Sequence, residues 1–168
     1  LAELKARYDG YHFSPRMTDI YNPFSLLNAF DGAELRDYWF ESATPGSLID
    51  ILAQMPPLDL TELDGIECDA SAFDRPFNSY DNPLPALFQS GYLTITNCDQ
   101  DEYETLYTLG LPNLEVRRGF ASVLYEYVMA VKGVDTVRSV FLQAYTRFRR
   151  TADLPAFIAA LQTFFAGI

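Results

Sequence analysis

The sequence predicts a mainly α-helical protein with one small β-hairpin, an α+β fold. In the last third of the chain, apolar residues recur at helical spacing in three successive stretches. Between residues 92 and 109, β-branched and aromatic residues alternate with polar ones, as they do in strands. Asn22-Pro23 and Asn82-Pro83 each combine a good N-cap residue with a proline suited to the first helical turn. Together these patterns predict a helical N-terminal region, a central hairpin unit and a C-terminal helical hairpin.

The central unit is the stretch around which the chain is organised. A short apolar helix from Leu84 is predicted to end at Gly91. Strands are predicted at Tyr92–Thr96 and Tyr103–Leu109, on either side of an acidic turn at Asn97–Glu102. A long amphipathic helix then follows. The order helix, hairpin, helix predicts a winged-helix-like unit, a shape that occurs in many modules and does not by itself specify a function.

The elements before this unit are predicted from residues that cap the starts of helices and from glycines and prolines that end them. They are the end of a helix at Leu1–Tyr8, a loop or β-arm at Tyr11–Ile20, a helix from Asn22-Pro23 to Asp31-Gly32, a helix from Thr44-Pro45 to about Met55, and a strand at Gly65–Asp69.

Three helices are predicted after the unit, the first ending at Lys132-Gly133 and the third capped by Asp153. Short connections make such helices antiparallel neighbours. We expect Phe157 and Leu161 to be core residues, each worth about 2 to 5 kcal/mol on truncation to Ala. The apolar positions are Val116, Phe120, Val123, Leu124, Tyr127, Val128 and Val131, then Val137, Val140, Phe141, Ala144, Tyr145 and Phe148, then Leu154, Phe157, Ile158, Leu161, Phe164 and Phe165.

Composition indicates a globular chain of one domain or two small ones in contact, with an uneven charge. The 168 residues carry a net charge of -11, and 49% of them are hydrophobic. Residues 1–115 hold 20 acidic and 5 basic side chains, whereas residues 116–168 hold 3 acidic and 7 basic. One interpretation is a solvated acidic surface. The other is that the basic tail faces a neighbouring domain or nucleic acid, although an acidic body argues against wrapping a phosphate backbone.

Few residues in the sequence point to catalysis. The nine glycines form no phosphate-binding loop, and the single histidine, His12, leaves no metal cluster or histidine-based triad, so we predict no catalytic and no metal-binding residues. Cys68 and Cys98 are interpreted as reduced thiols of a cytoplasmic protein. No apolar stretch is long enough for a membrane span or a signal peptide. Because the chain starts at Leu1 and stops at Ile168, we expect a fragment of a longer protein.

The arginines of the basic tail are the candidate contacts. Pairs such as these are usually surface charges, and a contact with nucleic acid or a protein partner is the alternative. The candidates are Arg117, Arg118, Arg147, Arg149 and Arg150.

Five ordered motifs support a resemblance to a known family. They are YDGYHF, YNPFSLLNAF, YWFESATPGSLI, LFQSGYLTI and LPNLEVRRGF, which begin at Tyr8, Tyr21, Tyr38, Leu87 and Leu111. The chain resembles the bacterial AAA-ATPase-like proteins that carry a C-terminal PD-(D/E)XK nuclease-like domain, common in gut and oral anaerobes. Ser42-Ala43, Ala86 and Ser90 depart mildly from the family pattern.

The resemblance implies three regions: a helical lid at residues 1–75, the winged-helix-like unit at 76–120, and helices at 113–168 that lead to the nuclease-like domain. It also implies that the phosphate-binding loop and Walker B strand precede residue 1. This fragment would then hold no cofactor, and ATP with magnesium would bind only the longer protein. Tyr21, Asn22 and Pro23 match a lid segment that packs against the nucleotide base. A helix cap with a packed tyrosine is an equally good interpretation of these three residues.

Two hypotheses about function follow. In the first, the fragment is a non-catalytic lid and connector that relays the state of its own ATPase core to its nuclease-like domain. In the second, it is a winged-helix module that binds DNA, and the acidic turn at residues 99–104 argues against this hypothesis. Neither hypothesis involves a membrane.

Overall fold

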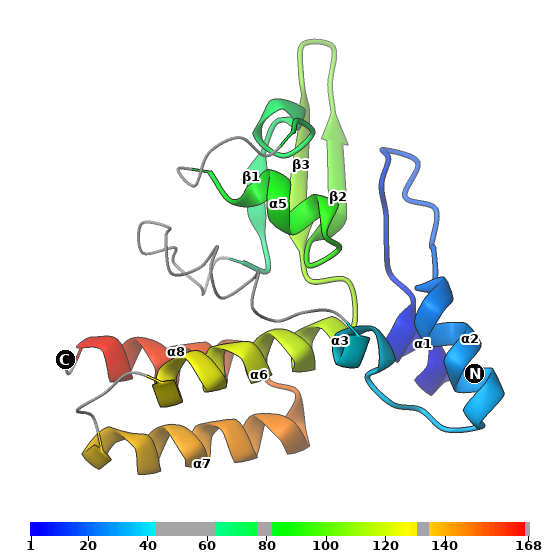
Figure 1. Ribbon diagram of the computed structural model, residues 1–168. Coiled ribbons are helices and arrows are strands. Elements are labelled where there is room, and N and C mark those ends of the chain that lie inside the picture. Colours follow the sequence, from blue (N-terminus) through cyan, green and yellow to red (C-terminus); the bar gives the residue numbers. More distant parts are fainter. Residues whose placement is uncertain (43–62, 77–81, 131–134, 167–168) are drawn as a thin grey trace.

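The computed structural model describes residues 1–42, 63–76, 82–130 and 135–166. The protein is mainly helical with a three-stranded antiparallel sheet (Figure 1), which confirms the predicted α+β class. The helices are α1 (Ala2–Tyr8), α2 (Pro23–Gly32), α3 (Tyr38–Ser42), α5 (Leu84–Gln89), α6 (Leu114–Ala130), α7 (Asp135–Thr151) and α8 (Leu154–Ala166), with a 3₁₀ turn, η2, at Ala70–Ala72. The strands are β1 (Ile66–Cys68), β2 (Thr94–Gln100) and β3 (Thr105–Gly110).

The sheet consists of the predicted hairpin of β2 and β3, with β1 paired to the outer edge of β3. The strand order is β1-β3-β2, so β3 is central, and β1 falls within the stretch predicted as a strand. Cys68 on β1 and Cys98 on β2 both pair with Tyr107 on β3. The two cysteines therefore lie on opposite sides of the central strand, and both are free thiols.

The predicted turn at Asn97–Glu102 is wrong, because β2 continues through these polar residues to Gln100. The ladder of hydrogen bonds to β3 outweighs the low strand propensity of Asn and Asp. The tight turn comes later, where the Asp101 carboxylate accepts the backbone N–H groups of Tyr103 and Glu104, both at 2.8 Å. β2 also starts later than predicted. The N–H groups of Tyr92 and Leu93 donate to the carbonyl of Leu87 and close the end of α5 instead.

The N-terminal elements follow the predicted caps. The Asn22 side chain accepts the N–H of Ser25 at 3.2 Å and starts α2, and α1 ends at Asp9. The predicted arm at Tyr11–Ile20 closes through one antiparallel bridge between its two end residues. His12 fixes this arm to β2, because its Nδ1 lies 2.8 Å from the Ile95 carbonyl. His12 therefore has a structural role in this fold.

Helix α6 is the central element of the molecule. It contacts α1 and α3 near its start and α7 and α8 further along, and Figure 1 shows it extending from one group of helices to the other. The predicted apolar stripes largely form the core, and Phe157 and Leu161 are buried as expected. Val140 is the exception, because 59% of it is exposed.

Some predictions fall outside the described residues. They are the helix from Thr44-Pro45 to Met55, the helix end at Lys132-Gly133, and the side chains of Tyr127, Val128, Val131, Val137, Phe164 and Phe165. Across the described ranges, no helix has the length and apolar character that crossing a membrane requires.

Candidate functional site

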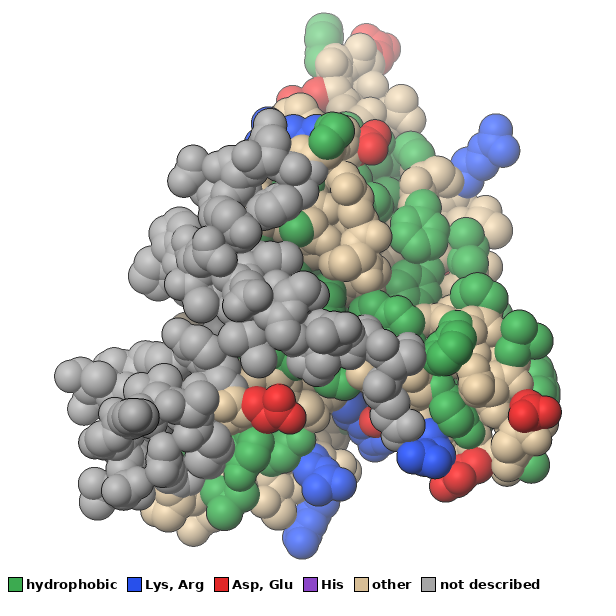
Figure 2. All heavy atoms as spheres, in the orientation of Figure 1, with side chains coloured by type: hydrophobic (Ala, Val, Ile, Leu, Met, Phe, Trp, Pro, Cys, Tyr) green, Lys and Arg blue, Asp and Glu red, His purple; other side chains and the backbone are tan. Residues whose placement is uncertain are grey.

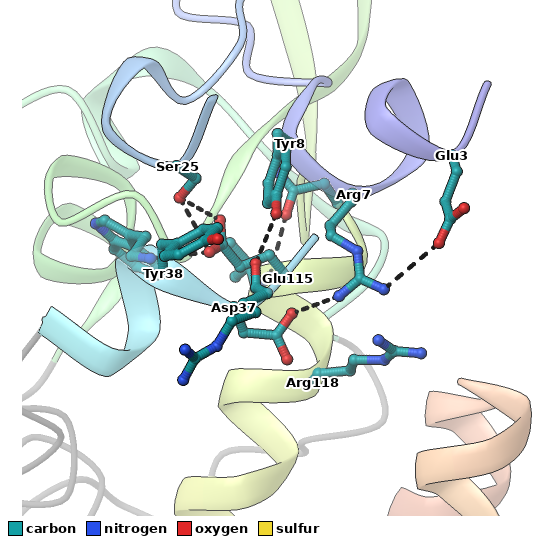
Figure 3. Close-up of polar contacts among 12 residues, drawn as sticks. Glu3, Arg7, Tyr8, Ser25, Asp37, Tyr38, Glu115 and Arg118 are labelled. Atoms are coloured by element: carbon teal, nitrogen blue, oxygen red, sulfur yellow. Dashed lines mark hydrogen bonds and ion pairs between the residues drawn. The ribbon is translucent and has the colours of Figure 1, made fainter. Parts of the chain in front are cut away.

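A buried carboxylate lies where the N-terminal helices meet α6 (Figure 3). Glu115, in the first turn of α6, is 0% exposed. Its two oxygens accept the Ser25 hydroxyl of α2 at 2.9 and 2.8 Å, and one of them accepts the Trp39 N–H of α3 at 2.8 Å. One side chain thus joins three helices. We call Glu115, Ser25, Trp39, Arg7 and Asp37 the N-terminal junction.

Local sequence explains why Glu115 lies at this point. Pro112 precedes the helix, and the Asn113 side chain caps it by accepting the N–H of Val116 at 3.1 Å. An acidic residue in the first turn also interacts favourably with the helix dipole. The Asn113 amide donates to the Asp9 carbonyl at 3.0 Å and so fixes the end of α1 against the start of α6. Gly10 is required here, because its φ is +92° and a Cβ would meet the Pro112 carbonyl.

Burial raises the pKa of Glu115 to about 7. The hydrogen bonds from Ser25 and Trp39 oppose this shift, and the nearby Asp37 carboxylate adds to it. A carboxyl group in this environment therefore changes its protonation near neutral pH.

Arg7 and Asp37 extend the junction on the α1 side. The Arg7 guanidinium lies 3.0 Å from the Asp37 carboxylate and 3.9 Å from that of Glu3 (Figure 3). The buried Tyr8 hydroxyl donates to the Arg36 carbonyl at 2.7 Å. These contacts tie α1 to the segment that leads into α3, so α1, α2 and α3 are all held around the start of α6.

Tyr21, Asn22 and Pro23 lie at the entrance to α2, next to this junction. Asn22 is buried, and besides its cap its N–H donates to the Tyr8 carbonyl at 2.8 Å. Tyr21 is half-buried and Pro23 is exposed. The cap interpretation of Asn22 is therefore confirmed by geometry, and Tyr21 and Pro23 both retain exposed surface.

Arg117 and Arg118 follow Glu115 on α6 but differ from free surface cations. Arg117 forms a two-pronged ion pair with Asp64, with one N–O distance of 3.0 Å, and also donates to the Leu111 carbonyl. Arg118 is half-buried, and its Nε is buried without a hydrogen bond in the described structure. Both arginines are thus partly committed to packing within the protein.

Arg147, Arg149 and Arg150 form a separate group, which the fold does not bring to the junction. They lie in the last turns of α7, where all three are exposed. Positive charge at this end of a helix interacts favourably with its dipole. Arg147 and Arg150 also line a shallow hollow of about 380 Å³ with Leu142. This basic surface is available to a partner.

The described residues provide no group of three or more metal-ligating side chains. The aromatic residues Tyr8, Tyr11, Trp39 and Phe40 are buried or half-buried, whereas Phe13 is 53% exposed. The contacts of Glu115 with Ser25 and Trp39 support the joining of helices.

Sequence reasoning missed the residues that make the junction. Ser25, Arg7 and Asp37 belong to no chemical motif, and Glu115 resembles an ordinary first-turn acid. The available signal was the position of Glu115 between Leu114 and Val116 at the start of an apolar stripe. An acid within such a stripe is a candidate for burial with a polar partner.

Comparison with known proteins gives one informative match. Over 124 residues the chain is 35% identical to a protein described as "Uncharacterized protein in vnfD 5'region" from Azotobacter chroococcum mcd 1. The match covers 73% of this chain and 23% of that protein, so the chain spans less than a quarter of the relative's length. No family model and no solved structure matches the chain.

Proposed function

We propose that this chain is a non-catalytic connector in a longer AAA-ATPase-like protein, in which it relays the state of the ATPase to a nuclease-like domain. In this proposal the N-terminal helices form part of the ATPase lid. Helix α6 transmits a change in the position of these helices to α7 and α8. ATP and magnesium are bound by the longer protein, in the cytoplasm, and not by this chain alone.

The observation that supports the proposal is the attachment of α2 and α3 to α6 by the buried Glu115. Helix α6 is one continuous element of 17 residues, or about 25 Å at 1.5 Å per residue. A movement of the lid helices would therefore displace the start of α6. Because α6 is one stiff helix that also packs on α7 and α8, the displacement would reach these two helices. The 23% coverage of the longer relative fits a chain that works as part of a larger protein.

Hydrogen exchange of the full-length protein with and without ATP and magnesium tests the relay. We expect ATP to change exchange both in α1–α3 and in α7–α8. In Glu115→Ala the ATP effect should persist in α1–α3 and disappear from α7–α8. An unchanged ATP effect in α7–α8 of this variant would contradict the relay. If Pro23 contacts the nucleotide base, Pro23→Ala should also weaken ATP binding.

The alternative function is DNA binding by a winged-helix module. The observed order α5, β2, β3, α6 and the exposed arginines of α7 support it. The ion pair of Arg117 with Asp64 weakens it, because this arginine is already neutralised. Fluorescence anisotropy with a labelled duplex separates the two functions. Binding that falls steeply with salt and is lost in Arg147→Ala/Arg150→Ala would favour DNA, and no binding at low salt would favour the connector.

A further inference from the structure

Helix α2 presents an apolar face that no described element covers. Phe24, Leu27 and Phe30 recur every three residues on one side of the helix, and Leu27 and Phe30 are 68% and 67% exposed. Ile20, just before the helix, is also exposed. Figure 2 shows hydrophobic side chains gathered on the α2 side of the molecule, beside acidic ones. We call Phe24, Leu27 and Phe30 the α2 face.

The surroundings of the α2 face are acidic. From Met17 to Leu35 the sequence holds three carboxylates and no lysine or arginine, and one of the three, Asp19, is ion-paired with Lys5. Asp31 and Glu34, at the end of α2, are both exposed. A surface that covers the α2 face therefore needs apolar side chains together with positive charge.

Helix α7 offers both features. Val140 is 59% and Leu142 47% exposed, and Arg147 and Arg150 follow on the same helix. Leu142, Arg147 and Arg150 line one hollow, and Val140 with Arg147 lines a second hollow of about 300 Å³ against α8. From Ser139 to Ala152 the sequence holds three arginines and no acidic residue, and Asp153, which follows, lines the second hollow. We call Val140, Leu142, Arg147 and Arg150 the α7 face.

We propose that the α2 face of one copy of this chain docks on the α7 face of a second copy. Phe and Leu side chains of α2 enter the hollows of α7, and Asp31 and Glu34 lie against Arg147 and Arg150. Aromatic and aliphatic anchors inside a charged rim are the usual anatomy of a protein interface. The two faces lie on different helices at separate places in the fold (Figure 1), so they meet only between molecules. This proposal does not depend on the ATPase relay.

Sedimentation velocity over a concentration series tests the interface with two variants. Leu27→Ser/Phe30→Ser removes the α2 face, and Arg147→Glu/Arg150→Glu reverses the charge of the α7 face. All four side chains are exposed, so both variants should fold, which far-UV circular dichroism checks. We expect wild type to associate as concentration rises, and each variant alone to associate at least about tenfold more weakly. High salt should weaken wild-type association, because the rim is charged.

Mixing the two variants gives the decisive result. The charge-reversed copy retains its α2 face and the other retains its α7 face, so an equimolar mixture should form a 1:1 complex that neither variant forms alone. Leu106→Ser and Arg75→Glu are matched controls at exposed positions away from both faces, and should associate as wild type does. The proposal is overturned if wild type is monomeric throughout, if the charge-reversed variant still associates like wild type, or if the mixture forms no complex.

Discussion

The two ends of α6 are held in different ways. At its start, the N-terminal junction uses a buried carboxylate, a hydroxyl, the Trp39 backbone N–H and an arginine. Further along, α6, α7 and α8 pack through stacked and tilted aromatic rings, such as Tyr125 on Tyr145 with ring centres 4.3 Å apart. Phe141, Phe148 and Phe157 are fully buried in the described parts of α7 and α8.

This difference between polar contacts and aromatic packing indicates what each end of α6 contributes to the fold. Burial of aromatic rings stabilises mainly by removing apolar surface from water, which is a non-directional effect, and the preferred ring geometries add a smaller contribution. Buried hydrogen bonds contribute less net stability, but they fix one geometry because an unmet partner is costly. We therefore expect the C-terminal helices to dominate stability and the N-terminal junction to set the position of α1, α2 and α3 on α6.

The largest effect should come from Phe157→Ala. Phe157 is buried and its ring lies within 6 Å of those of Phe141, Tyr145 and Phe148. The cavity left by the ring should lower the free energy of unfolding by about 3 to 5 kcal/mol, measured by urea denaturation. Val140→Ala on exposed surface should cost less than about 1 kcal/mol. If Phe157→Ala and Val140→Ala lowered the free energy of unfolding equally, the packing of α7 and α8 would not be the main source of stability.

Glu115 should make the stability of the junction depend on pH. Its pKa rises from 4.5 to about 7 on folding, so the folded state binds more protons between these values. Its contribution is fully present below pH 4.5 and falls as pH rises through 7, by about 3 kcal/mol in all. Glu115→Gln should remove this decline from the pH profile of unfolding. Glu126→Gln, at an exposed position of α6, should keep it. A decline that persists in Glu115→Gln would contradict the assignment.

A smaller effect is expected where α3 touches the backbone of α6. A Cβ at Gly119 would overlap the ring of Phe40. Alanine normally favours a helix over glycine by about 1 kcal/mol, but here overpacking should reverse the sign. We expect Gly119→Ala to destabilise by about 1 to 3 kcal/mol and to alter the near-UV circular dichroism of Trp39. If Gly119→Ala is more stable than wild type, α3 does not pack closely on α6.

The smallest effect should come from the Arg117–Asp64 ion pair, because both side chains are about one-third exposed. Exposed pairs contribute about 0.2 to 1 kcal/mol, and Arg117→Ala should fall in this range. Thermal unfolding in low and high salt measures the effect, which salt should reduce. A cost well above 1 kcal/mol would mean that the pair supports the joint between α6 and residues 63–69 more strongly than its exposure implies.

Periodicity and caps predicted the helices and strands well because these signals are local. The Asn22 cap, the Gly91 helix end and the Asp153 cap are all present. The sequence placed the hairpin turn too early, because pairing with β3 extends β2 through residues that prefer turns. The apolar spacing of Phe24, Leu27 and Phe30 is typical of a helix face that packs on a core, yet in the structure this face is exposed.

The junction could not be predicted from the sequence alone. Glu115 and Ser25 are 90 residues apart, and only the fold brings them together. The arginine candidates were identified as one group, but packing divides them into a paired Arg117, a half-buried Arg118 and three exposed arginines on α7. Such distinctions depend on long-range contacts, which no local pattern encodes.

The most direct test of the central claim is the distance between spin labels on α2 and α8. Labels at Asp31→Cys and Ala159→Cys, both exposed positions, would be attached in a Cys68→Ser/Cys98→Ser background and measured by double electron–electron resonance at low protein concentration. If Glu115 fixes α2 and α3 on α6, the unmodified junction gives one narrow distance distribution, Glu115→Ala broadens it, and Glu126→Ala leaves it unchanged. An equally narrow distribution at the same distance in Glu115→Ala would contradict the claim.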